Sequence, residues 1–170
     1  MKIITITGVP QAGKDKFVEY AKESDYPVYN FSTVDFIKEK ALSLGWDGNK
    51  DDKGRRFLSD LKDALSLYND APFQNVLYKI KSIPQDDAIV FVHTREPEDI
   101  KRWKEETNSI SLLVRRAVAE DNIYNNHADS KVFDYDYDYV YRNDGELKQL
   151  KIDAISFTNW IGGKNWESMV

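Results

Sequence analysis

No cysteine occurs in this chain of 170 residues, and histidine occurs only twice, at His93 and His127. The absence of cysteine excludes disulfide bonds and cysteine-ligated metal centres. Two histidines are too few for a zinc site built mainly from histidine. Stabilisation by disulfides and the commonest kinds of structural zinc site are therefore excluded.

An excess of positive charge is also lacking, since 24 Lys and Arg residues face 29 Asp and Glu residues and the formal net charge is −5. Nucleic-acid-binding domains usually carry a basic excess, so we expect no nucleic-acid partner, and local basic clusters have to provide any phosphate binding. The longest aliphatic and aromatic run, Ala88 to Val92, is far too short to span a membrane. The N-terminus shows no hydrophobic segment typical of a signal peptide. We therefore expect a cytoplasmic protein with no membrane partner.

The apolar content of 41% is typical of a globular protein rather than a disordered one. With this length it predicts a single domain over residues 1–170. The composition does not define an oligomeric state, and a homodimer remains open.

One short stretch combines the residue types that bind phosphate. A β-branched strand at residues 2–7 is followed by two glycines five positions apart, a lysine and the start of a helix. This order is typical of the Walker A phosphate loop, in which backbone N–H groups and the helix N-terminus hold the phosphates. The alternative is an ordinary glycine turn with a solvated lysine. The prediction is an ATP site formed by Gly8, Pro10, Gln11, Ala12, Gly13, Lys14, Asp15 and Lys16.

Hydrophobic patterning predicts strands that alternate with helices along the chain. The strands are expected near residues 2–7, 26–31, 88–92, 109–114 and 137–141. The helices are expected near residues 14–23, 34–44, 57–68, 72–80, 97–103 and 147–161. Such alternation predicts an α/β fold with a five-stranded parallel sheet flanked by helices.

Arginines follow several of these strands, although the protein is acidic overall. Because parallel sheets bind ligands at the carboxyl ends of their strands, these side chains should gather at one edge. Cations around a phosphate cradle are what phosphoryl transfer requires. The candidate residues after the second to fourth strands are Ser32, Asp35, Lys38, Arg95, Glu96, Arg115 and Arg116, with Arg55 and Arg56 in the helical stretch between the second and third strands.

The order of these features resembles the nucleoside monophosphate kinases. It comprises a phosphate loop, a helical insertion at 32–85, an arginine after the third strand and a short arginine-led lid at 115–135. The Gly-Lys-Asp ending of the loop is similar to the phage-type deoxynucleoside monophosphate kinases and the animal phosphomevalonate kinases. Further similarity lies in residues 31–41, 45–48, 53–58, 95–100 and 137–145.

This resemblance implies an adenylate kinase-like P-loop NTPase fold that uses ATP and Mg²⁺. Lys14 would bridge the β- and γ-phosphates, and one of Arg115 and Arg116 would stabilise the transferred group. Asp15, which stands where Ser or Thr is usual, and Glu96 would bind Mg²⁺. Each has an alternative, since Asp15 is also a favourable first-turn acid and Glu96 could cap the helix at Pro97.

The substrate contacts that the resemblance implies are Ser32, Asp35, Lys38, Arg95 and one of Arg55 and Arg56. Adjacent helical positions point about 100° apart, so only one of those two arginines should reach the acceptor phosphate. A structural salt bridge is the alternative for Arg95, and ordinary exposed charges are the alternative for Asp35 and Lys38.

Three functions are consistent with the sequence. The first is transfer of phosphate from Mg²⁺–ATP to a small acceptor such as a (deoxy)nucleoside monophosphate. The second is a kinase of the same fold that acts on a non-nucleotide phosphate such as phosphomevalonate. The third is an inert ATP-binding module, favoured by the missing P-loop hydroxyl and the absent Walker B aspartate. The strand-end arginines argue against the third, because ATP binding alone needs no second phosphate site.

Overall fold

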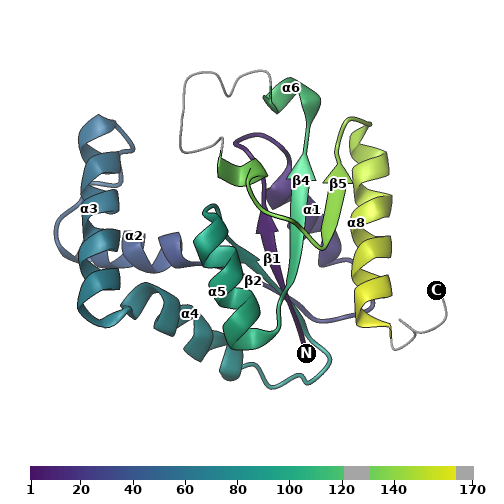
Figure 1. Cartoon of the computed structure of the whole chain (residues 1–170), viewed down its shortest axis with the longest axis horizontal. Coiled ribbons are helices and arrows are strands. Elements are labelled where there is room, and N and C mark those ends of the chain that lie inside the picture. The colour runs from purple at the N-terminus through teal and green to yellow at the C-terminus, as the bar shows by residue number, and fades with distance from the viewer. Residues whose placement is uncertain (121–130, 164–170) are drawn as a thin grey trace. The chain divides into compact units, whose positions relative to one another are not determined.

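Five strands form one parallel sheet in the computed structural model, which describes residues 1–120 and 131–163 (Figure 1). Their order across the sheet is β2-β3-β1-β4-β5. The predicted fold class, a five-stranded parallel sheet flanked by helices, is confirmed. The strands are β1 (Lys2–Thr7), β2 (Val28–Ser32), β3 (Ile89–His93), β4 (Ile110–Arg115) and β5 (Tyr139–Arg142).

The longer helices occupy the stretches that the hydrophobic pattern predicted, with shifted ends, and two short helical turns at 117–120 and 131–133 were not predicted. Ser32 caps one of them, because its hydroxyl accepts a hydrogen bond from the Val34 N–H at 3.2 Å. Another runs past Trp103, until Asn108 ends it in a left-handed conformation. The helices are α1 (Lys14–Ala21), α2 (Thr33–Ser43), α3 (Asp52–Asn69), α4 (Ala71–Lys81), α5 (Pro97–Thr107), α6 (Ala117–Glu120), the 3₁₀ turn η2 (Lys131–Phe133) and α8 (Leu147–Gly162).

The central strand β1 lies between β3 and β4. Ile4 pairs with Phe91 of β3 on one side and with Ile110 of β4 on the other. The chain fills one side of β1 with β2 and β3 and then crosses to the other side for β4 and β5. The carboxyl end of β1 is therefore the point where the direction of strand addition reverses, which is where open α/β sheets bind ligands.

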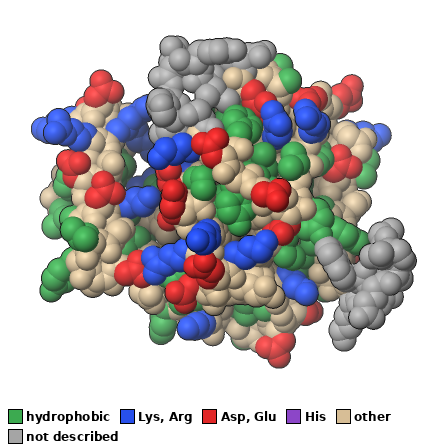
Figure 2. Space-filling view, in the orientation of Figure 1, with side chains coloured by type: hydrophobic (Ala, Val, Ile, Leu, Met, Phe, Trp, Pro, Cys, Tyr) green, Lys and Arg blue, Asp and Glu red, His purple; other side chains and the backbone are tan. Residues whose placement is uncertain are grey.

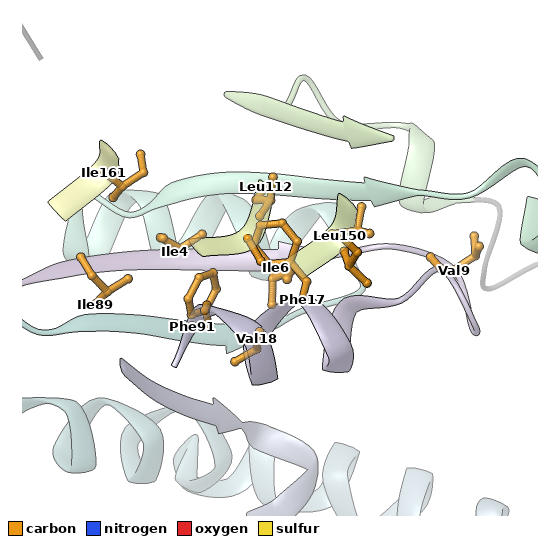
Figure 3. Close-up of a cluster of buried hydrophobic side chains, with 14 of the residues drawn as sticks. Ile4, Ile6, Val9, Phe17, Val18, Ile89, Phe91, Leu112, Leu150 and Ile161 are labelled. Carbon is orange, nitrogen blue, oxygen red and sulfur yellow. The ribbon is translucent and has the colours of Figure 1, made fainter. Parts of the chain in front are cut away.

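The side chains of β1 point alternately to the two faces of the sheet, so each face has its own part of the core. Ile4 and Ile6 are fully buried in a cluster with side chains of α1 and α8, and Figure 3 shows Phe17 of α1 among them. The Phe17 ring lies 5.3 Å from the ring of Tyr141 and 5.8 Å from that of Phe157. Helix α5 covers the other face (Figure 1). These contacts hold the start of α1 rigidly behind the end of β1.

The chain divides into two compact units. One comprises Met1–Asn30 and Gln85–Val170, and the other comprises Phe31–Pro84. In the second unit α2, α3 and α4 pack against one another. This unit covers nearly the range predicted as the substrate-binding insertion, and that role stays a prediction, as does the single-domain organisation. No helix in the described part of the chain is long and apolar enough to cross a membrane.

A polar clamp built on Asp138 joins β4, α5 and the entry to β5. The Asp138 carboxylate accepts hydrogen bonds from the Lys104 ammonium at 2.7 Å and from the Ser111 N–H and hydroxyl, both at 2.8 Å. Burial raises the pKa of Asp138, but its bonds to Lys104 and Ser111 together hold that pKa below its ordinary value. The ionised carboxylate therefore stabilises the folded state.

Replacing Asp138 with asparagine is expected to lower the free energy of unfolding at pH 7 by about 1–2 kcal/mol, since the side chain is partly exposed. The pKa of Asp138 is lower in the folded state than in the unfolded state, where it is about 3.9. The ionised carboxylate therefore stabilises the fold fully above that unfolded pKa, and this stabilisation is lost as the pH falls through the folded pKa. The difference between Asp138→Asn and wild type should therefore shrink below about pH 4. Urea unfolding between pH 7 and pH 3 tests this, with the exposed Asp87→Asn as control. A difference that stays constant with pH would contradict the assignment.

Candidate active site

The loop between β1 and α1 turns tightly at two glycines. Gly8 has a φ of +153°, and a Cβ there would collide with the carbonyl oxygen of Val114 in β4. Gly13 has a φ of +101° and precedes the first residue of α1. Between them the Ala12 N–H donates to the Val9 carbonyl at 3.2 Å, and Gln11 has a φ of +64°. With Pro10 in the second position, this is the pattern of a type II turn.

The Lys14 ammonium lies against this loop. It donates to the carbonyl oxygens of Gly8 at 2.7 Å and of Val9 at 2.9 Å, and is half-buried. The loop backbone thus holds a cation over the N-terminus of α1, where the helix dipole adds partial positive charge. Missing Cβ atoms, a helix N-terminus and a lysine together suit the phosphates of a nucleotide.

The acidic residues predicted to bind Mg²⁺ differ in their surroundings. The Asp15 side chain is 97% exposed, with its carboxylate 3.8 Å from Nδ1 of His93. Glu96 precedes α5, but its carboxylate makes no cap hydrogen bond and lies 3.8 Å from the Lys131 ammonium. Magnesium is commonly held by one or two carboxylates together with substrate phosphates and water, and Asp15 suits that arrangement. No group of three or more His, Cys, Asp or Glu side chains within the described residues could hold a metal ion.

Arg115 and Arg116 are adjacent but differently placed. The Arg115 guanidinium donates to both oxygens of Glu120, at 2.9 and 2.6 Å, and lies over the Phe133 ring. The hydrogen bonds with Glu120 raise the pKa of Arg115 and lower that of Glu120. Arg116 is exposed and makes no ion pair with the described residues. The middle of the predicted lid, residues 121–130, lies outside the described ranges.

Arg95 is exposed directly after β3 and Thr94, and it too makes no ion pair with the described residues. The Lys16 ammonium lies 2.8 Å from Glu19 and over the Tyr20 ring, and its contact with the cofactor stays a prediction. Lys14, Arg95 and Arg116 thus all lie at or near the carboxyl ends of their strands, as the sheet topology predicts.

The remaining predicted substrate residues belong to the second unit. The Ser32 hydroxyl caps α2, and Lys38 pairs with Asp35 at 3.5 Å. Arg55 donates to the Lys50 carbonyl at 2.8 Å, while Arg56 lies 3.9 Å from Asp60 and is largely exposed. Their substrate contacts stay predictions.

Three hydroxyl groups form a small polar cluster beside the phosphate loop. The hydroxyls of Thr7 and Thr94 are 2.8 Å apart and link the ends of β1 and β3. The Tyr137 hydroxyl donates to the Val132 carbonyl at 2.7 Å. Burial raises the pKa of Tyr137 to about 12, although hydrogen bonding to Thr7 opposes this rise. The contact between Thr7 and Thr94 links two neighbouring strand ends, and no local pattern in the sequence indicated it.

A second feature that the sequence analysis missed is the side chain of Asn143, which donates to the Ala12 carbonyl at 2.9 Å. Asn143 directly follows β5, so its place at the ligand edge was predictable. Its residue type, however, is equally typical of a turn.

Charges of both signs accompany one another at the surface. On the face in view in Figure 2, Lys and Arg side chains are interspersed with Asp and Glu. A phosphate site here therefore depends on local placement of cations and backbone N–H groups rather than on a broad basic patch.

Comparisons with protein-family models and with curated proteins gave no match. Solved structures do match. TT1252 from Thermus thermophilus has a TM-score of 0.57 and 17% sequence identity, over 95% of this chain and 98% of that chain. The dephospho-CoA kinase from Campylobacter jejuni has a TM-score of 0.54 and 12% identity, over 94% of this chain and 97% of that chain. At these identities the similarity establishes the fold alone, which this chain shares with TT1252 and with the dephospho-CoA kinase.

Proposed function

We propose that this protein transfers a phosphoryl group from Mg²⁺–ATP to a small phosphorylated acceptor, a (deoxy)nucleoside monophosphate. The observation that carries the proposal is the phosphate loop, in which Lys14 lies against the carbonyls of Gly8 and Val9 at the switch point of the sheet. The chain that carries this loop has a fold similar to that of a dephospho-CoA kinase. The resemblance to the phage-type deoxynucleoside monophosphate kinases supplies the acceptor class.

The residues have distinct proposed roles. Backbone N–H groups of the loop and the Lys14 ammonium bind the nucleotide phosphates, and Lys14 stabilises the charge that develops during transfer. Asp15 binds Mg²⁺, with Glu96 as the second acid; the metal neutralises phosphate charge when bound. Arg95 binds the acceptor phosphate, together with one of Arg55 and Arg56. The acceptor oxygen is already anionic, so positioning rather than a general base accounts for catalysis.

An acceptor panel tests the proposal. The protein is incubated with Mg²⁺–ATP and each (deoxy)nucleoside monophosphate in turn, with phosphomevalonate as a further arm, and ADP is measured. ADP formation that depends on one nucleotide is the expected result. Dependence on phosphomevalonate instead would reassign the substrate. ATP binding without acceptor-dependent ADP would identify an inert nucleotide-binding module and contradict the proposal.

Replacing Arg95 with alanine is expected to raise the acceptor KM, or lower kcat, with little effect on ATP affinity. A hydrogen bond to a charged group contributes about 1.5–3 kcal/mol, which is roughly 10- to 100-fold. Steady-state kinetics in each substrate measure the two effects separately. The exposed Lys101→Ala on α5 is the control. A comparable loss of ATP affinity would rule out this role for Arg95.

Substitution of one of the two adjacent arginines is expected to affect catalysis, and substitution of the other to affect stability. Arg116 is the lid arginine in this proposal, so Arg116→Ala should lower kcat roughly 10- to 100-fold without changing the melting temperature. Arg115→Ala should lower the melting temperature, because it leaves the partly buried Glu120 carboxylate without its partner. Steady-state kinetics and thermal unfolding of both variants measure kcat and the melting temperature. The reverse pattern would assign the lid role to Arg115.

A further inference from the structure

Asn143 connects the end of β5 to the phosphate loop. Its side chain is only 7% exposed, and Nδ2 donates to the Ala12 carbonyl at 2.9 Å. Its backbone N–H donates to the Arg115 carbonyl at 2.7 Å. A buried amide that is satisfied in this way holds its partner firmly, because breaking the bond would leave polar groups unpaired away from water.

The same amide also occupies the space beside Gly13. A Cβ on Gly13 would collide with Nδ2 of Asn143. Gly13 has a φ of +101°, which a residue with a side chain rarely adopts. The glycine and the asparagine are therefore complementary, since the missing side chain admits the amide that binds the preceding carbonyl.

This bond determines the orientation of the peptide between Ala12 and Gly13. In a trans peptide the C=O and the N–H point in opposite directions. With the Ala12 carbonyl directed at Asn143, the Gly13 N–H must point away from Asn143. A rotated peptide would instead present a carbonyl oxygen, which repels phosphate.

We infer that Asn143 is a positioning residue for nucleotide binding, which acts through the Ala12 carbonyl to direct the Gly13 N–H toward the phosphates. The inference rests on one part of the proposed function, namely that the loop binds a nucleotide. Asn143 lies 131 positions from its partner in the loop and directly follows β5, the strand farthest along the sheet from β2.

The test measures ATP affinity by calorimetry, without acceptor, together with the melting temperature. Asn143→Ala and the similarly shaped Asn143→Leu are both expected to weaken ATP binding about tenfold or more, since tenfold corresponds to about 1.4 kcal/mol. The matched control is Asn159→Ala. Asn159 of α8 likewise binds a distant backbone group, since it accepts a hydrogen bond from the Asp25 N–H at 2.9 Å, and neither residue belongs to the loop between β1 and α1. This control should lower the melting temperature and leave ATP affinity unchanged.

A double-mutant cycle then tests the contact directly. Gly13→Ala should weaken ATP binding by a larger factor in the wild-type background than in Asn143→Ala, where the new Cβ no longer meets Nδ2. Losses that simply multiply would overturn the inference, as would wild-type ATP affinity in both Asn143 variants. If the wild type binds ATP but transfers nothing, the proposed function fails while the role of Asn143 is still tested.

Discussion

Lys14→Ala is expected to abolish phosphoryl transfer. Removing one group that stabilises transition-state charge typically lowers kcat about 10²–10³-fold, and Lys14 also contributes to holding the nucleotide before transfer. Its ammonium already lies against the loop, 2.7 Å from the Gly8 carbonyl and 2.9 Å from the Val9 carbonyl.

The measurement is acceptor-dependent ADP formation, together with the melting temperature of each variant. Lys22→Ala is the matched control, because Lys22 is an exposed lysine at the other end of α1. It should retain full activity. Lys14→Arg keeps the charge but changes its geometry, so it should keep ATP binding better than it keeps kcat. Undiminished transfer by a folded Lys14→Ala protein would show that the phosphate-loop assignment is wrong.

Gly8→Ala is expected to lower stability more than substitution of either Gly48 or Gly145. The new Cβ would collide with the Val114 carbonyl, a backbone group in the neighbouring strand that cannot rotate aside. The φ of +153° adds backbone strain. Overpacking and strain each cost about 1–3 kcal/mol, so the sum is roughly 2–6 kcal/mol. Since domains are typically stable by about 5–15 kcal/mol, much of the folding free energy would be lost.

Substitutions at two other glycines distinguish the cost of a steric collision from the cost of backbone strain. Gly48 has a φ of +86° but open space around it, so Gly48→Ala should cost only the strain, about 1–2 kcal/mol. At Gly145 the nearest atom is 3.7 Å away, and Gly145→Ala should change stability by less than about 1 kcal/mol. Urea unfolding of the three variants ranks their losses of unfolding free energy. Equal stability of Gly8→Ala and Gly145→Ala would contradict the close approach of β1 to β4.

Local patterns in the sequence predicted most of the fold. The buried run at residues 88–92 and the β-branched run at residues 2–7 formed the central strands within one residue of the expected limits. Ser32 and Pro72 began helices as their residue types indicate. These signals depend only on residues a few positions apart, which is why sequence periodicity can detect them.

The candidate site was predictable only in outline. The rule that ligands bind at the carboxyl ends of parallel strands located Lys14, Arg95 and Arg116 at that edge. It could not show that Arg115 pairs with Glu120 and lies over the Phe133 ring while Arg116 is exposed, because these are contacts of the folded chain. Nor could it show that Lys16 turns toward Glu19, since the i,i+3 pair and a phosphate contact are equally open to an exposed lysine.

The sequence by itself determined the strand and helix pattern, the glycine spacing of the phosphate loop and the arginines that follow the strands. Only the tertiary structure decided which groups support that loop. Asn143 reaches Ala12, and Val114 approaches Gly8, because β4 lies beside β1 and β5 beside β4. Hydrogen bonds and steric contacts between residues more than 100 positions apart depend on strand order and register, and local residue patterns carry little of that information.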